Sequence, residues 1–158
     1  YPSTFGMASA LISAGVDRDM ILGKLYNRFK ESRIRLQGHM LKDMMRITSD
    51  GVAYMTLDRK TAEEYNVEEG DTEGFVNIPL TIDKVLMSIF AKEDNGFVRI
   101  SIRSKKGTSA NMCAKLHFHG GGHENAAGGR LYCPEDITDI SQTGSYIEKV
   151  THSFMTNE

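Results

Sequence analysis

Apolar residues recur every three or four positions through the first third of the chain, which predicts amphipathic helices. The first pattern ends at Gly15, a residue that favours a helix C-terminus. Asp17 is placed to cap a second helix that runs to Phe29. A third helical pattern, rich in methionine, runs from Ile34 to Met45. The N-terminal part of the chain is therefore expected to be helical.

Alternating apolar and polar positions replace this spacing after about residue 45. Strands are predicted at residues 45–48, 52–57, 85–91, 97–102 and 130–132. Turn residues join the first two of these strands at Ser49-Asp50-Gly51 and the next two at Asp94-Asn95-Gly96. Short helices are predicted at residues 59–65, at 72–78 until Pro79 ends that helix, and at 111–116. An amphipathic helix closes the last twenty or so residues.

Helices followed by strands mixed with helices predict an α/β fold, with α+β as the alternative. We expect a small mixed β-sheet flanked by helices. The change of pattern near Arg46 divides the chain into a helical connector, residues 1–46, and a second domain, residues 47–158. Because the chain begins at Tyr1 and not at a methionine, we expect it to be part of a longer protein.

The overall charge and the cysteine content narrow the classes of partner. A formal net charge of -2 argues against a chain that coats long duplex DNA, but it allows a local site for one or a few phosphates. Two cysteines, Cys113 and Cys133, form no disulfide framework and indicate a reducing compartment, so a cytoplasmic protein is expected. No apolar stretch is long enough to cross a bilayer, and no membrane partner is expected.

Residues 117–129 read HFHGGGHENAAGG, with Gly120, Gly121 and Gly122 directly before His123. Glycines without a Cβ let a ligand approach the main chain, and their consecutive N–H groups can surround an anion. A histidine at the rim adds a donor, or a full charge when it is protonated. The motif is neither a Walker loop nor the GxGxxG pattern of a dinucleotide site. The alternative interpretation is a tight loop that lets two elements pack closely.

The strand VRISIRS, residues 98–104, has two chemically different faces. Its valine and isoleucines point to the core, whereas Arg99, Ser101 and Arg103 share the opposite face. Arg103 and Ser104 stand at the end of the strand, and the planar guanidinium of arginine suits phosphate oxygens. The alternative is a solvated strand face that ends in a basic turn.

Two other chemistries have weaker support. Cys113, His117, His119 and His123 are spaced two to four residues apart and include zinc-type ligands, but no second cluster completes the shell. No GxSxG motif indicates a serine nucleophile, and no Asp-His-His string occurs.

The segment containing ISIRS and HGGGHENAAGG resembles the C-terminal domain of DHH-family phosphoesterases, in which a GGGH motif precedes an alanine-rich AAG. The resemblance extends to DTEGFVNIPLTIDKVLMSIFAKE, before the paired strands, and to GMASALISAGVD, which is similar to the connector between the two domains of the family. Within the family the chain is most similar to the bifunctional oligoribonuclease and phosphoadenosine-phosphate phosphatase group. Relatives of that group include cyclic-di-AMP phosphodiesterases, RecJ-type exonucleases and exopolyphosphatase-like proteins.

This resemblance implies that catalysis belongs to another part of the parent protein. In the family, an N-terminal domain with the Asp-His-His motif holds two manganese ions, and that motif is absent here. The resemblance therefore implies no catalytic residue, metal or cofactor on this chain, a catalytic DHH domain in cis, and short RNA or phosphoadenosine phosphate as substrate. The alternatives are a stand-alone module that binds nucleic acid or a nucleotide and, less favoured, a zinc enzyme built on the histidines.

The resemblance also implies a set of substrate-binding residues. These are the RS pair after the second strand, an asparagine before the short helix and the GGGH motif, namely Arg103, Ser104, Asn111, Gly120, Gly121, Gly122 and His123. His119 stands where many relatives have a fourth glycine. It is a candidate additional donor or stacking surface for a base, unless it turns outward.

Overall fold

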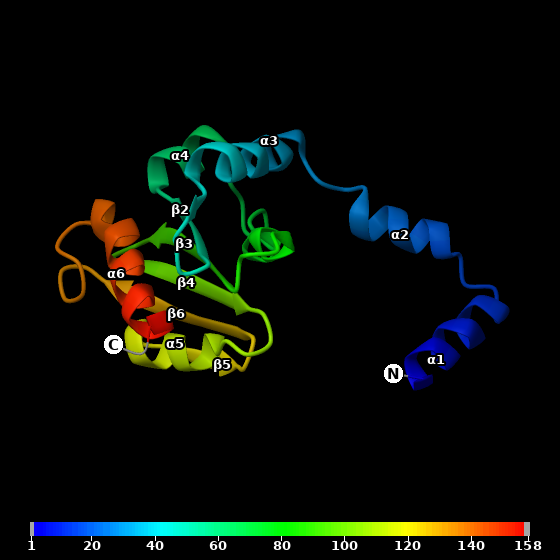
Figure 1. Ribbon diagram of the computed structural model, residues 1–158. Coiled ribbons are helices and arrows are strands. Elements are labelled where there is room, and N and C mark those ends of the chain that lie inside the picture. Colours follow the sequence, from blue (N-terminus) through cyan, green and yellow to red (C-terminus); the bar gives the residue numbers. More distant parts are fainter. Residues whose placement is uncertain (1, 157–158) are drawn as a thin grey trace.

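The computed structural model describes residues 2–156, which form a sheet-containing body with a helical arm at the N-terminus (Figure 1). The helices are α1 (Pro2–Ser13), α2 (Arg18–Tyr26), α3 (Glu31–His39), α4 (Arg59–Glu64), α5 (Ala110–His117) and α6 (Thr143–Thr156). A π-helix η1 (Met40–Met44) and the 3-10 helices η2 (Phe75–Thr81) and η3 (Ile140–Gln142) complete the helical elements of this range. The strands are β1 (Arg46–Ile47), β2 (Val52–Leu57), β3 (Met87–Asp94), β4 (Phe97–Ser104), β5 (Gly121–His123) and β6 (Ala126–Tyr132).

The strands form one six-stranded sheet in the order β1-β2-β3-β4-β6-β5. Strands β2 and β3 pair in parallel, and all other neighbours pair antiparallel. This mixed sheet with flanking helices confirms the predicted fold class. Both hairpin turns predicted from sequence are also confirmed, because Gly51 and Gly96 take the left-handed φ values of +79° and +77° that such turns need.

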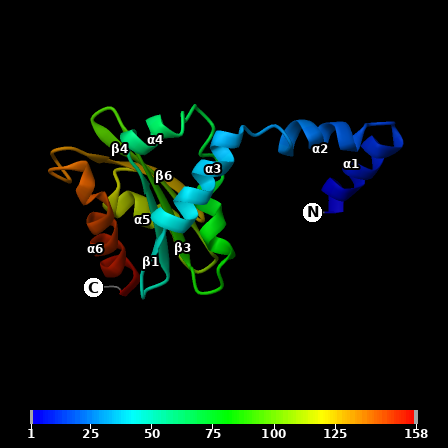
Figure 2. The same ribbon diagram turned by 90° about the horizontal axis from the view of Figure 1, so that it is seen from above.

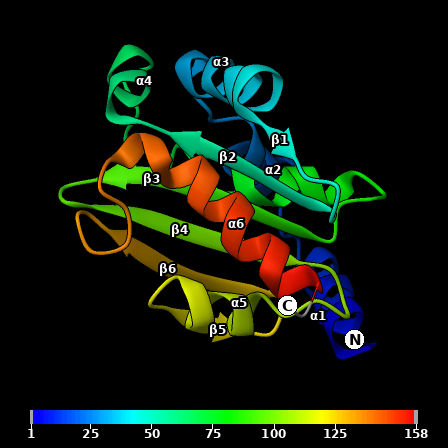
Figure 3. The same ribbon diagram turned by 60° about the vertical axis from the view of Figure 1, so that its left-hand side comes forward.

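Each face of the sheet packs against its own helices. On one face, alternate residues of β2, β3, β4 and β6 pack against α5 and α6 (Figure 3). This cluster includes Ile89, Ile100, Ile102 and Leu131 of the strands, Cys113 and Ile147 of the helices, and Phe118 directly after α5. On the other face, Met55, Leu57 and Phe90 pack against Leu36, Met40, Phe75 and Val76. The second cluster covers mainly β2 and β3, so the same face of β4 and β6 keeps exposed or half-buried polar residues.

Helices α1 and α2 extend away from the body, whereas α3 and η1 pack on it (Figures 1 and 2). Met7 and Leu11 are 66% and 51% exposed, as expected of a connector. Leu36 and Met40 are fully buried, and Met44 and Met45 are half-buried against the second cluster. The division of the chain at Arg46 stays a prediction. No helix among residues 2–156 has the length and apolar character needed to cross a membrane.

Three local predictions were wrong, each for a structural reason. The glycine-rich segment is not a loop followed by a short strand, because its glycines form the hairpin β5–β6. Pro79 lies inside η2 instead of ending a helix, since its fixed φ is compatible with a 3-10 helix. The long pattern that ended at Met45 is divided into α3 and the π-helix η1.

Candidate functional site

Three neighbouring strands bring Arg103 and His123 to the two sides of Ala126. Ala126 on β6 is the cross-strand partner of Arg103 on β4 and also of His123 on β5. Residues directly opposite each other in antiparallel strands share a face, so both side chains lie on the face of the sheet that α5 and α6 do not cover. Their Cα atoms are separated by two strand spacings, roughly 10 Å. Ala126, the residue between them, has a short side chain that separates the two groups by little bulk.

The guanidinium of Arg103 lies against the backbone of this region. The Nη1 atom of Arg103 donates to the carbonyl oxygens of Ile102 and Ala127, at 2.9 and 3.5 Å. Arginine has five N–H donors, so contacts made through one nitrogen leave further donors available to phosphate oxygens. The side chain is half-buried, which reduces the solvent screening of its charge. His123 is exposed at the end of β5.

Close approach of backbone segments explains most of the glycines in the motif. A Cβ on Gly120 would collide with the carbonyl oxygen of Gly128, and a Cβ on Gly129 would collide with that of Phe118. A Cβ on Gly122 would lie 2.6 Å from the carbonyl oxygen of Ala126. Gly121 differs, because its nearest neighbours would be the Asn111 and Lys115 side chains at 3.5 and 3.7 Å, which is ordinary contact. Packing within the chain therefore does not require a glycine at position 121.

Asn111 fixes the position of the glycine strand. Ser109 caps α5 by accepting a hydrogen bond from the Met112 N–H. This places Asn111 in the first turn of the helix, where its Oδ1 accepts a 3.1 Å hydrogen bond from the Gly122 N–H. Asn111 thus orients the main chain of β5 next to His123.

Ser104 points to the opposite face of β4 from Arg103, because the two residues are adjacent in a strand. It is buried, and its hydroxyl donates to the Thr108 carbonyl at 2.6 Å and accepts from the Asn125 Nδ2 at 3.1 Å. Asn125 also donates to the Lys105 carbonyl at 3.0 Å. This network ties the turn after β4 to the turn between β5 and β6. Sequence reasoning missed Asn125, although an asparagine directly after GGGHE is a typical turn residue.

His119 lies at the other end of β6 from Ala126. Its backbone has a left-handed φ of +45°. Its Nε2 shares a 2.8 Å hydrogen bond with the Asp136 carboxylate, and the centre of its ring lies 5.5 Å from the centre of the Tyr132 ring. Tyr132 is six residues beyond Ala126 on one strand, a span of roughly 20 Å. Burial alone would raise the pKa of Asp136, but hydrogen bonds from His119 and from the Tyr132 N–H hold that pKa below its usual range. The structure thus separates His119 from Arg103 and His123.

The histidine-rich segment does not form a metal site in the described part of the chain. Within residues 2–156, no group of three His, Cys, Asp or Glu residues could hold a metal ion. Cys113 is buried, and desolvation raises the pKa of its thiol to about 12, so the thiolate that a metal needs is disfavoured. His117 packs edge-on against Phe154, and burial lowers the pKa of its imidazole. These residues fit neither the zinc alternative nor a two-manganese centre.

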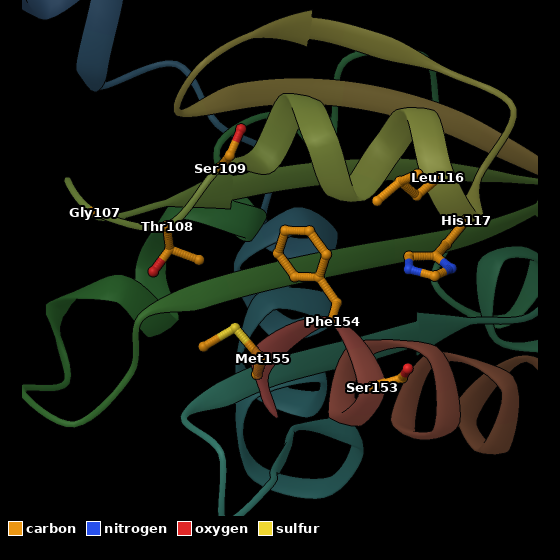
Figure 4. Close-up of a pocket in the computed structure, with 8 residues that line it drawn as sticks. All are labelled: Gly107, Thr108, Ser109, Leu116, His117, Ser153, Phe154 and Met155. Carbon is orange, nitrogen blue, oxygen red and sulfur yellow. The ribbon is translucent and has the colours of Figure 1, made fainter. Parts of the chain in front are cut away.

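A pocket of about 480 Å³ lies between α5 and α6, on the helix-covered side of the sheet (Figure 4). Thr108 and Ser109 of the preceding loop, Leu116 and His117 of α5, and Phe154 and Met155 of α6 contribute to its lining. The Arg103–Ala126–His123 row does not line this pocket. The candidate residues instead lie on strands β4, β5 and β6, where His123 is exposed and Arg103 is half-buried.

Several known proteins are similar to this chain. It is 29% identical over 130 residues to the "Bifunctional oligoribonuclease and PAP phosphatase NrnA" of Thermus thermophilus. The aligned region covers 82% of this chain and 38% of that protein. A crystal structure of an exopolyphosphatase-related protein from Bacteroides fragilis matches 99% of this chain and 44% of its own, with a TM-score of 0.88 and 34% identity. A pGpG-specific phosphodiesterase, PggH from Vibrio cholerae, has a similar fold, with a TM-score of 0.55 at 16% identity over 94% of this chain and 51% of that chain.

The chain thus spans less than half the length of the curated relative and of the Bacteroides fragilis protein. The family model of the DHHA1 domain matches residues 49–147, which include the strands β2, β3, β4, β5 and β6 and the helix α5. On this match, together with the similar Bacteroides fragilis structure, the chain belongs to the DHHA1 domain family.

Proposed function

We propose that this chain is the substrate-binding part of a cytoplasmic, manganese-dependent DHH phosphoesterase that hydrolyses short oligoribonucleotides or phosphoadenosine phosphate. The oligoribonuclease and phosphatase named in the similar Thermus thermophilus protein support this class of substrate. The pGpG phosphodiesterase is consistent with it at the level of fold. Because the described residues hold no metal-binding group, the manganese ions and the chemistry they supply are assigned to a DHH domain elsewhere in the parent protein.

The observation that carries this proposal is the cross-strand row of Arg103, Ala126 and His123. An arginine and a histidine on one open face, with only an alanine between them, offer charge-assisted hydrogen bonds to a single phosphate. In the glycine strand beside them, Gly121 is half-buried and Gly122 is exposed, and Asn111 holds that strand in place. In this proposal, these residues bind and orient a terminal phosphate while hydrolysis occurs in the opposing domain.

Binding measurements on variants of the full-length parent test this proposal. We expect Arg103→Ala to weaken the binding of a diribonucleotide and of phosphoadenosine phosphate by about tenfold to a hundredfold, because a charge-assisted hydrogen bond contributes ~1.5–3 kcal/mol. His123→Ala is expected to weaken both, by a smaller factor, since an imidazole cannot bind phosphate in a bidentate manner. Titration calorimetry with manganese withheld would measure affinity without turnover.

Three control variants separate this role from a general structural one. Arg99→Ala removes an exposed arginine from the same strand face, where its Nη2 pairs with Asp94 at 2.9 Å, and should leave affinity nearly unchanged. His119→Ala alters the far end of β6 and should also have a small effect. Ser104→Ala should lower stability by about 1 kcal/mol without changing affinity, because its hydroxyl bonds the backbone. Equal affinities of the wild type, Arg103→Ala and His123→Ala would refute the proposal.

A further inference from the structure

A second group of cations lies on the same face of the sheet as Arg103, toward the other end of β4. Arg99 on β4 is the cross-strand partner of Arg130 on β6 and also of Lys92 on β3. Residues directly opposite each other share a face, so the three side chains form a basic row across three strands. Like charges in such positions repel each other and weaken the pairing of the strands. The basic row is therefore not explained by the stability of the sheet.

The carboxylates around the basic row neutralise only part of its charge. Asp94 pairs with Arg99 at 2.9 Å. In the described part of the chain, neither Arg130 nor Lys92 takes part in an ion pair. Arg130 is exposed, and its guanidinium lies 4.8 Å from the ring centre of Phe97. An anion from outside the chain would therefore offset charge that the chain itself leaves unpaired.

Aromatic rings adjoin the basic row at this end of the sheet. Phe97 and Tyr132 are cross-strand partners on this face, and their ring centres are 6.4 Å apart. The ring centre of His119 lies 5.5 Å from that of Tyr132. Phe97 and Tyr132 are half-buried, and the His119 side chain is 55% exposed. Partly exposed rings beside cations are the surfaces on which proteins stack the bases of single-stranded nucleic acid, and we call these three residues the aromatic platform.

The spacing along the strands sets the length of a ligand that could use both ends of this face. Arg99 and Arg103 are four residues apart on β4, which is roughly 14 Å. Tyr132 lies roughly 20 Å along β6 from the level of Arg103. The face between them carries the small residues Ser101 and Gly128, which are cross-strand partners. We expect a ligand of one or two nucleotides at Arg103 to end before the platform, whereas a strand of about five nucleotides reaches it.

We propose that the basic row and the aromatic platform form a second subsite, which binds a phosphate and a base of a single-stranded oligoribonucleotide whose terminal phosphate lies at Arg103 and His123. This inference rests on the proposed function for the terminal phosphate. Cations hold the backbone of a nucleic acid without reading its sequence, and aromatic rings accept any base by stacking. The second subsite therefore selects ligands by their length and by the presence of bases. An inorganic polyphosphate has the charge but no base to stack.

Affinity as a function of ligand length tests the second subsite in the full-length parent. Titration calorimetry with manganese withheld would compare a diribonucleotide with a pentaribonucleotide. The wild type should bind the longer ligand about tenfold more tightly, because only that ligand reaches the basic row. Arg130→Ala should lower affinity for the pentaribonucleotide about fivefold to tenfold and leave affinity for the diribonucleotide unchanged. Equal affinities of the wild type for the two lengths would overturn the inference.

The salt dependence of affinity separates a phosphate contact from an indirect effect of the arginine. For single strands, the logarithm of affinity falls with the logarithm of salt concentration by about 0.7 for each phosphate contact. Arg130→Ala should therefore reduce that slope by ~0.7 for the pentaribonucleotide. Arg35→Ala is the matched control, since it removes an exposed arginine on α3 that pairs with Glu31, and it should change neither slope nor affinity. An unchanged slope for Arg130→Ala would contradict a phosphate contact there.

Variants of Tyr132 test the stacking of a base. Tyr132→Leu removes the ring but keeps an apolar side chain, and it should lower affinity for the pentaribonucleotide about fivefold to a hundredfold. Tyr132→Phe keeps the ring and should keep the affinity. Tyr65→Leu is the control, because Tyr65 is also half-buried and its ring centre lies 5.5 Å from that of a histidine, His39, but it packs in the second cluster. A Tyr132→Leu protein that melts as the wild type and binds with full affinity would exclude stacking.

The remaining outcomes separate the second subsite from the proposed function. A short inorganic polyphosphate should bind the wild type and Tyr132→Leu equally, and tighter binding of polyphosphate than of the pentaribonucleotide would overturn the choice of an oligoribonucleotide. Weakened diribonucleotide binding by Arg103→Ala, together with no effect of ligand length, would overturn the second subsite alone. A length effect that Arg130→Ala removes, together with unaltered affinity of Arg103→Ala, would refute the proposed phosphate site and leave the second subsite in place.

Discussion

The two faces of strands β4 and β6 are built from alternate residues of the same segments, yet they differ in burial and in charge. One face carries Ile100, Ile102 and Leu131, which are almost fully buried under α5 and α6. The other carries Arg99, Arg103 and Arg130, which are exposed or half-buried. The covered face supplies the burial that stabilises the sheet, and the open face carries the residues that we propose to bind a phosphate.

The two faces show how a β-sheet can place the side chains that stabilise it apart from those that we propose to bind a ligand. Because successive side chains of a strand point to opposite faces, a residue can change on one face without altering packing on the other. Ser104 and Arg103 illustrate this, since the first joins two turns through buried hydrogen bonds and the second lies beside Ala126. The separation is weaker at the β5–β6 hairpin, where a Cβ on Gly120, Gly122 or Gly129 would collide with backbone atoms.

The largest expected effect comes from the covered face. Ile102→Ala should lower the free energy of unfolding by about 2–5 kcal/mol, because Ile102 is fully buried and its truncation leaves a cavity. The adjacent change on the open face, Ser101→Ala, should alter it by less than about 0.5 kcal/mol. Urea unfolding of both variants measures the difference. Similar losses for the two variants would contradict the distinction between the faces.

A smaller effect is expected at the hairpin, where neighbouring glycines differ. Gly120→Ala should destabilise the protein by about 1–3 kcal/mol, because its Cβ would press on the backbone of β6. Gly121→Ala should be nearly neutral, since its neighbours lie at 3.5 Å or more. Thermal unfolding of the Gly120→Ala and Gly121→Ala variants measures the difference in their stability. If Gly121→Ala nevertheless weakened nucleotide binding, the result would place the ligand against the main chain of β5.

The smallest effect concerns a polar contact at the edge of the covered face. The Tyr54 hydroxyl donates to Glu148 of α6 at 2.6 Å, and burial together with this hydrogen bond raises the pKa of Tyr54 to about 12. Tyr54→Phe should cost about 1 kcal/mol at neutral pH. Because the folded pKa is raised above the unfolded value of about 10, this stabilisation is complete below pH ~10 and is lost as pH rises to ~12.

Absorbance titration of the tyrosines and the stability of Tyr54→Phe against pH would measure this contribution. One tyrosine should ionise only near pH 12, and its signal should be missing from the Tyr54→Phe variant. Wild type and variant should converge in stability across that interval. A constant difference in stability between pH 9 and pH 12 would show that the hydrogen bond does not contribute as described.

Local patterns in the sequence determined the features that depend on near neighbours. The two glycine turns, the Asp17 cap and the two faces of β4 follow from residues within a few positions of each other, and the structure confirms them. The nature of the site residues was also visible, because Arg103 and the glycine-histidine motif have a chemistry that suits phosphate. The boundaries of α3 and η2 were less accurate, since tertiary packing altered how those segments coil.

Only the tertiary structure decided which of these residues meet. The pairing of Ala126 with Arg103 joins segments about twenty residues apart, although its other partner, His123, lies in the same hairpin. Glycine strands carry no alternating pattern from which that register could be read. The position of His119 depends on Asp136, a residue in the loop beyond β6. The parallel pairing of β2 with β3 likewise depends on burial of both strand faces between helices. Sequence fixes local geometry because its causes are local, whereas a site assembled across strands is set by packing of the whole sheet.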